Sequence, residues 1–149
     1  MPDPVTVSVE VARPRQEVFD HVDVLSNHEA WLKNLYKDWT FDGPTRGVGA
    51  TARATPDAPT SRERVEIKVV ESQAPERIVE EVVSAHGKRE TTGTYRFTES
   101  GAGRTRIEFE LAWRKAPRSE RVAPFLSRAF MARALGKSMK SLAAQLEKG

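Results

Sequence analysis

The C-terminal segment of the chain constrains the fold most, because it carries a single long apolar stripe. From Val122 to Leu146, apolar residues recur at intervals of three and four residues, which is the spacing of one face of an α-helix. A helix of about 28 residues would be about 42 Å long at a rise of about 1.5 Å per residue. The stripe must be buried, so the rest of the chain is expected to supply a large apolar surface.

Segments in which apolar and polar residues alternate predict that surface. Alternation with a period of two is typical of half-buried β-strands. Short turns rich in glycine and proline separate the segments, which indicates an antiparallel sheet built from hairpins. The predicted strands are about residues 5–11, 35–41, 48–55, 62–71, 77–84, 90–98 and 107–113.

Two short helices are predicted between the first and second strands. The first covers about residues 14–24, because Pro14 fits the first turn of a helix and apolar residues follow at helical spacing. The second covers about residues 26–32, with Ser26 and Glu29 in the positions of a capping box. Residues 1–149 are expected to form one α+β domain, since the chain has the size of a single domain and shows no internal repeat or linker.

The composition argues against several kinds of site. The chain has no cysteine, which excludes disulfides, thiolate metal ligands and cysteine nucleophiles. The histidines, His21, His28 and His86, lack the spacing of metal ligands, and no phosphate-binding or dinucleotide glycine motif occurs. We therefore expect neither a metal nor a cofactor. The N-terminal residues do not resemble a signal peptide and no apolar run could span a bilayer, so a cytoplasmic protein without integral membrane association is expected.

Five short motifs follow one another along the chain in a fixed order. They occupy residues 7–19, 23–31, 43–50, 74–79 and 101–107. In this order they resemble the START-like superfamily, also called the SRPBCC or polyketide cyclase/dehydrase family, although Arg104 adds one residue after the last glycine. The resemblance implies a helix-grip fold, in which a curved antiparallel sheet of about seven strands wraps around the long C-terminal helix. It also implies an apolar cavity between the sheet and that helix.

Large apolar and aromatic side chains are the candidates to line this cavity, although each could also be ordinary core. They are Trp31, Val65, Ile67, Tyr95, Phe97, Phe109, Leu111, Trp113, Phe125, Ala129, Phe130 and Met131.

Adjacent glutamates in the strand over residues 77–84 supply the polar candidate. Side chains alternate along a strand, so Glu80 faces inward together with Ile78 and Val82, or Glu81 faces inward instead. An inward carboxylate needs a partner or a raised pKa, and Arg53 is one candidate partner. Glu80 is accordingly a candidate to orient a ligand or to act as a general acid.

Three functions are compatible with these features. The first is binding, transport or sensing of a small hydrophobic molecule, such as a lipid or a polyketide. The second is a polyketide aromatase/cyclase or dehydratase, which ranks lower because few polar groups converge for acid–base catalysis. The third is a surface interaction through the basic C-terminal helix, since residues 114–149 carry nine basic and two acidic side chains. Nucleic-acid binding is not expected, because no aromatic residues interleave with the basic ones.

Overall fold

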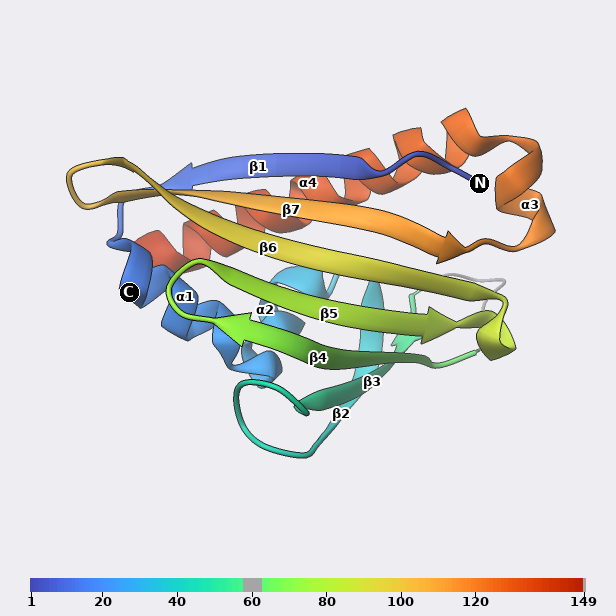
Figure 1. The fold of residues 1–149 in the computed structure, drawn as a ribbon, viewed down its shortest axis with the longest axis horizontal. Helices are drawn as coiled ribbons and strands as arrows, with labels where there is room; N and C mark the ends of the chain where they lie inside the picture. The colour runs from blue at the N-terminus through green and yellow to red at the C-terminus, as the bar shows by residue number, and fades with distance from the viewer. Residues whose placement is uncertain (58–62, 149) are drawn as a thin grey trace.

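One antiparallel sheet of seven strands faces the viewer in Figure 1, and the long C-terminal helix lies behind it. The computed structural model describes residues 1–57 and 63–148. The strand order is β1-β7-β6-β5-β4-β3-β2, and every neighbouring pair is antiparallel. The strands are β1 (Val5–Val11), β2 (Tyr36–Asp42), β3 (Thr51–Pro56), β4 (Val65–Gln73), β5 (Arg77–Ser84), β6 (Arg89–Gly101) and β7 (Arg104–Lys115).

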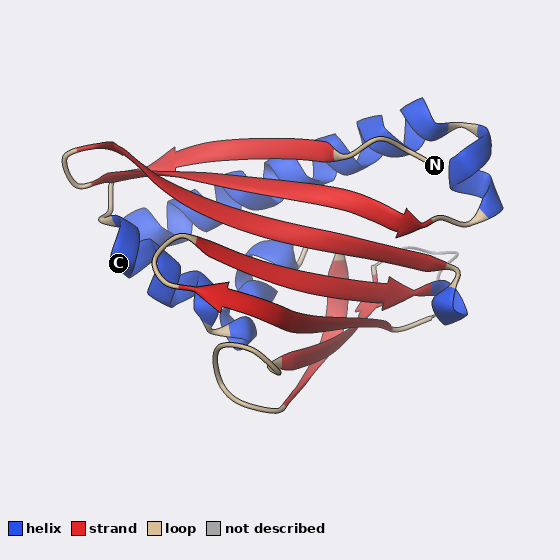
Figure 2. Ribbon diagram, viewed as in Figure 1, coloured by secondary structure: helices blue, strands red, loops and turns tan. Residues whose placement is uncertain are grey.

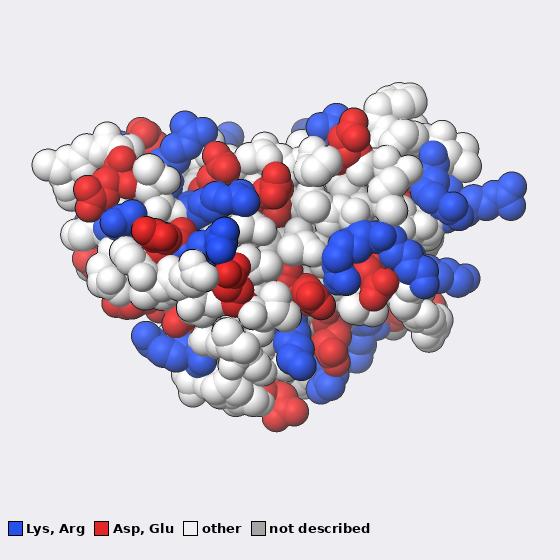
Figure 3. Space-filling view, in the orientation of Figure 1, with Lys and Arg blue, Asp and Glu red and all other residues white. Residues whose placement is uncertain are grey.

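The longer helices lie on one side of the sheet (Figure 2). The opposite face is the outer face, and it carries intermixed positive and negative side chains (Figure 3). This arrangement confirms the expected α+β helix-grip fold. The helical elements are α1 (Arg15–Asp23), η1 (Leu25–His28), α2 (Glu29–Leu32), η2 (Ala85–Gly87), α3 (Arg118–Val122) and α4 (Pro124–Lys148).

One strand begins later than the sequence predicts, and the predicted start of another cannot be compared. The strand expected from residue 48 begins at Thr51, because Gly47 and Gly49 adopt φ angles of 79° and 96° and turn the chain there. The strand expected from residue 62 is described from Val65, and its predicted start lies outside the described residues.

The second short helix also differs from the prediction. It is a 3-10 turn, η1, followed by one turn of α-helix, and Ser26 makes no capping hydrogen bond. Neighbouring side chains instead bind the free carbonyl groups at the end of α1. The amide of Asn27 donates to the His21 carbonyl at 2.9 Å, and Nε2 of His28 lies 2.7 Å from the Val22 carbonyl oxygen.

The C-terminal helix is broken where the sequence predicts a continuous one. Ala123 separates α3 from α4 with φ and ψ of −131° and 67°. Pro124 causes the break, since proline has no N–H and disfavours a helical conformation in the residue before it.

Fully buried side chains occur only in the second half of α4. Its buried residues all lie at or after position 135, so residues 124–134 contribute no buried side chain. The apolar stripe predicted for the whole helix is thus only half used for packing, and a space remains between the sheet and the first half of α4. The buried residues are Leu135, Ser138, Met139, Leu142, Ala143 and Leu146.

Candidate ligand-binding cavity

A cavity of about 540 Å³ occupies the space beneath the first half of α4. Its walls come from β4 to β7 of the sheet, from the segment around α2 and β2, and from α3 and α4. Most of the wall is apolar, and the volume is within the usual range for sites that bind small molecules.

Most of the candidate residues line this cavity. Those that do are Trp31, Val65, Ile67, Glu80, Tyr95, Phe109, Leu111, Trp113, Phe130 and Met131. They come together because the inward side chains of β4 to β7 face α4 across the cavity.

Three candidates, Phe97, Phe125 and Ala129, do not line it. Phe97 is buried beyond the cavity, where its ring meets the edge of Phe19 with centroids 5.6 Å apart. Phe125 is 69% exposed and Ala129 is also exposed, because the face of α4 turned to the cavity carries Leu126 and Phe130 instead. The positions of Phe125 and Ala129 depend on how α4 is rotated about its axis, and that of Phe97 depends on where the cavity ends along β6.

Glu80 is the inward glutamate of β5, with only 4% of its surface exposed, whereas Glu81 is exposed. Gly93 lies opposite Glu80 on β6 and leaves room for it. A Cβ atom at Gly93 would lie 2.8 Å from the ring of Phe109 and 3.2 Å from Cγ of Glu80. The missing side chain therefore allows a carboxyl group and an aromatic ring to occupy the same part of the cavity wall.

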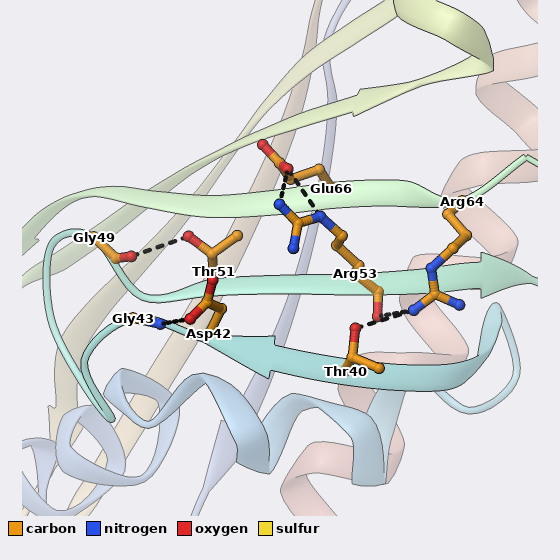
Figure 4. A network of polar contacts seen from close by, with 8 residues as sticks. All are labelled: Thr40, Asp42, Gly43, Gly49, Thr51, Arg53, Arg64 and Glu66. Atoms are coloured by element: carbon orange, nitrogen blue, oxygen red, sulfur yellow. Dashed lines mark hydrogen bonds and ion pairs between the residues drawn. The ribbon is translucent and has the colours of Figure 1, made fainter.

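Arg53 does not pair with this carboxyl group, contrary to the alternative considered from the sequence. Its guanidinium binds Glu66 on the outer face, with Nη2 2.9 Å from Oε2 (Figure 4). Arg53 faces outward because its neighbours Ala52 and Ala54 both point into the core.

His28 is the group that approaches Glu80. Nδ1 of His28 lies 4.0 Å from Oε2 of Glu80, which is too far for a hydrogen bond. Nε2 of His28 donates to the Val22 carbonyl, so Nδ1 carries a lone pair. Among the described residues, neither this Nδ1 nor Oε2 of Glu80 has a hydrogen-bond partner.

Burial decides the charge of both groups. It raises the pKa of Glu80 to about 8 and lowers the pKa of His28 to about 4. At pH 7 the carboxyl group is therefore mostly protonated and the imidazole is neutral. Burial also raises the pKa of the Tyr95 hydroxyl, which contributes to the same cavity wall. Glu80 and Tyr95 therefore present uncharged polar groups to the cavity, and Glu80 can donate a hydrogen bond into it. The imidazole of His28 approaches Glu80 but does not itself line the cavity.

A second polar cluster lines the end of the cavity beside α3. Arg89 forms an ion pair with both carboxylate oxygens of Glu120. The indole N–H of Trp113 donates to Oε1 of Glu120 at 2.9 Å, and Arg89 donates to Oγ of Ser84 at 3.3 Å. None of the residues of α3 is fully buried, so Glu120 is the main attachment of this short helix.

Apart from Glu80 and Tyr95, sequence reasoning missed the polar members of the wall. They are Asn34, Tyr36, Asp57, Ser84, Arg89, Thr91, Glu120, Ser127 and Ser138. The sequence could have identified Glu120 as a candidate, since it is the only acidic residue between positions 114 and 146 of a strongly basic segment. The others carry no distinctive pattern, because they lie on separate elements that only the fold brings together.

Neither a metal site nor a membrane-spanning helix is found within residues 1–57 and 63–148. No three acidic or histidine side chains are grouped there to hold an ion, and no helix is both long and apolar enough to cross a bilayer.

Comparison with solved structures gives neighbours with the same fold. ZhuI aromatase/cyclase from Streptomyces sp. R1128 is similar with a TM-score of 0.75 and 16% identity, over 97% of this chain and 93% of that chain. The protein TTHA0849 from Thermus thermophilus has a TM-score of 0.72 and 17% identity, over 96% of each chain. DynU16, from the dynemicin biosynthetic locus, has a TM-score of 0.70 and 20% identity, over all of this chain and 49% of that chain. These identities indicate a shared fold and nothing more specific.

A comparison with curated proteins finds no match. A comparison with family models assigns the chain to a family. The model is described as polyketide cyclase / dehydrase and lipid transport, and it matches residues 4–148. The match therefore includes every strand and helix that builds the cavity. Since it extends over nearly the whole chain, this protein belongs to the polyketide cyclase/dehydrase and lipid transport family.

Proposed function

We propose that the protein binds a small, mainly apolar molecule that carries a carbonyl or hydroxyl oxygen. The observation that carries this proposal is the unpaired, protonated carboxyl group of Glu80 in an otherwise apolar cavity of about 540 Å³. A buried polar group without a partner is costly, and a ligand oxygen that accepted its hydrogen bond would remove that cost. The apolar part of the ligand would contact the aromatic wall.

The proposal is tested with a pair of tryptophan substitutions on α4. Ser127 lines the cavity, so Ser127→Trp should fill the space from the helix side. Ala129 is exposed and does not line it, so Ala129→Trp adds the same side chain outside the cavity. Native mass spectrometry of each protein, purified from its own host, measures any small molecule released on denaturation. We expect one apolar molecule per wild-type and Ala129→Trp chain, and none with Ser127→Trp. Empty wild-type protein that also shows no thermal shift with a lipid and polyketide panel would contradict the proposal.

A second candidate function is cyclisation or dehydration of a polyketide-like substrate. A protonated carboxyl group facing an apolar cavity can hydrogen bond to the carbonyl oxygen of a bound ketone and favour its attack by an enol carbon. The neutral imidazole of His28, 4.0 Å from that carboxyl, is close enough to exchange a proton with it after a small movement.

Glu80→Gln separates the two functions. Glutamine keeps the shape and a hydrogen-bond donor but is not an acid. If the protein is an enzyme, Glu80→Gln should retain ligand binding and lose turnover of a poly-β-ketone substrate. If it is a carrier, wild type and Glu80→Gln should bind the ligand and leave it unchanged.

A further inference from the structure

Large apolar side chains are exposed together at the open end of the cavity. Among the described residues, half of the exposed large apolar side chains lie within nine consecutive positions of α3 and α4. We call these four the apolar rim: Val122, Phe125, Leu126 and Phe130, with exposed fractions of 75%, 69%, 59% and 67%. Such a concentration is unusual on a surface that meets only water.

Positive charge lies beside the apolar rim, on α3. Arg118 and Arg121 are exposed on α3, and no ion pair involves either of them within the part of the chain that the structure describes. The one acidic residue of this segment, Glu120, is turned inward and is neutralised by Arg89. In Figure 3, basic side chains project at the end of the molecule where α3 lies, beside an uncharged surface. Arg128 is not part of this set, because it donates to the carbonyl groups of Asp3 and Pro4.

The apolar rim is continuous with the cavity. Leu126 and Phe130 are exposed to solvent and also line the cavity wall. Any surface that covered the rim would therefore also cover the mouth of the cavity.

We infer that the apolar rim, Arg118 and Arg121 dock this end of the protein on an anionic lipid bilayer. Apolar side chains flanked by basic ones match the apolar boundary and negative head groups of such a bilayer. A second copy of the chain fits less well, because a two-fold interface through the rim would bring these arginines of both copies into one interface. In the docked state the cavity mouth opens toward the acyl chains, so an apolar molecule could pass between bilayer and cavity without crossing water.

Co-sedimentation with large vesicles tests the inference, using vesicles of phosphatidylcholine alone and of phosphatidylcholine with about one third phosphatidylglycerol. Wild type should sediment with the anionic vesicles at low salt and be released as the salt concentration rises. Phe125→Gln should lower its partition constant about tenfold, since it removes a large apolar side chain from the contact. Arg118→Gln combined with Arg121→Gln should lower it by a similar factor, and only on anionic vesicles.

Matched control variants remove the same kinds of side chain from parts of the surface outside the rim. Val48→Gln removes another exposed apolar side chain, in the loop between β2 and β3. Arg46→Gln combined with Lys68→Gln removes two other exposed positive charges. Both controls should bind vesicles like wild type. Equal loss in controls and rim variants, or wild type that stays in the supernatant with both kinds of vesicle, would overturn the inference. So would a wild-type dimer, seen by sedimentation velocity, that Phe125→Gln converts to a monomer. Vesicle binding is measured without a cavity ligand. The docking inference can therefore fail while the proposed binding function stands.

Discussion

Nδ1 of His28 faces Oε2 of Glu80 at 4.0 Å, and the two side chains are almost completely buried. The pKa of each group shifts toward its neutral form, since burial raises that of Glu80 to about 8 and lowers that of His28 to about 4. Glu80 therefore presents an acidic proton to the cavity without a charge, and the neighbouring His28, which does not line the cavity, keeps a lone pair. The two shifts lead to opposite dependences of stability on pH.

Glu80 should make the protein less stable as the pH rises. In the unfolded chain its carboxyl group ionises near its ordinary pKa of 4.5, whereas in the folded protein it stays protonated up to about pH 8. The stabilisation is complete below pH 4.5 and is lost between pH 4.5 and 8, by at most about 1.4 kcal/mol per pH unit. Glu80→Gln lacks this loss, so its free energy of unfolding in urea should rise relative to wild type over this interval. A difference that is constant with pH would contradict the assigned protonation state.

His28 should act in the opposite direction. Its folded pKa of about 4 lies below the ordinary value of 6.5, so wild type loses stability as the pH falls from 6.5 to 4. His28→Phe should remove this acid sensitivity. It should also cost about 1–3 kcal/mol at pH 7, because the Val22 carbonyl loses its partner. Urea denaturation of both proteins at several pH values measures the two effects separately. If the free energies of unfolding of wild type and His28→Phe change in parallel from pH 6.5 to 4, His28 does not titrate in that interval.

Gly93→Ala should destabilise the protein by about 1–3 kcal/mol, because the new Cβ would lie 2.8 Å from the Phe109 ring. Gly136→Ala is the matched control, since a Cβ there meets nothing within 4 Å. Because Gly136 lies within α4, alanine should stabilise the protein by up to about 1 kcal/mol. Thermal denaturation measures both changes. Equal tolerance at the two positions would show that the wall around Glu80 is not tightly packed.

Glu120→Ala should release α3 from the end of the cavity. It removes the acceptor for Arg89 and for the Trp113 indole, and α3 has no fully buried side chain to hold it otherwise. We expect faster amide hydrogen exchange in residues 118–122 and little change in the buried strands. Glu10→Ala, which removes the exposed ion pair with Arg104, should leave this exchange unchanged. Protection of α3 that persists in Glu120→Ala would show that other contacts hold it.

The sequence predicts the sheet well because strand patterns are local. Alternating apolar residues reveal which segments are half-buried, and glycine turns reveal where they reverse. The errors fall where a neighbouring group overrides the local pattern. Ser26 and Glu29 have capping-box spacing, but the side chains of Asn27 and His28 bind the end of α1 instead. The apolar spacing runs through position 123, but Pro124 interrupts the helix there.

The sequence by itself determined the seven-stranded sheet, the long C-terminal helix and most of the apolar cavity wall, since these depend on periodicity and on short turns. It also limited the inward carboxylate to two adjacent glutamates. Only the tertiary structure decided that Glu80 faces inward, that His28 approaches it and that Arg53 binds elsewhere. It also decided that Phe125 and Ala129 face solvent. The physical reason is that strand register and helix rotation are set by contacts between residues far apart in the chain, and such contacts leave no mark in local spacing.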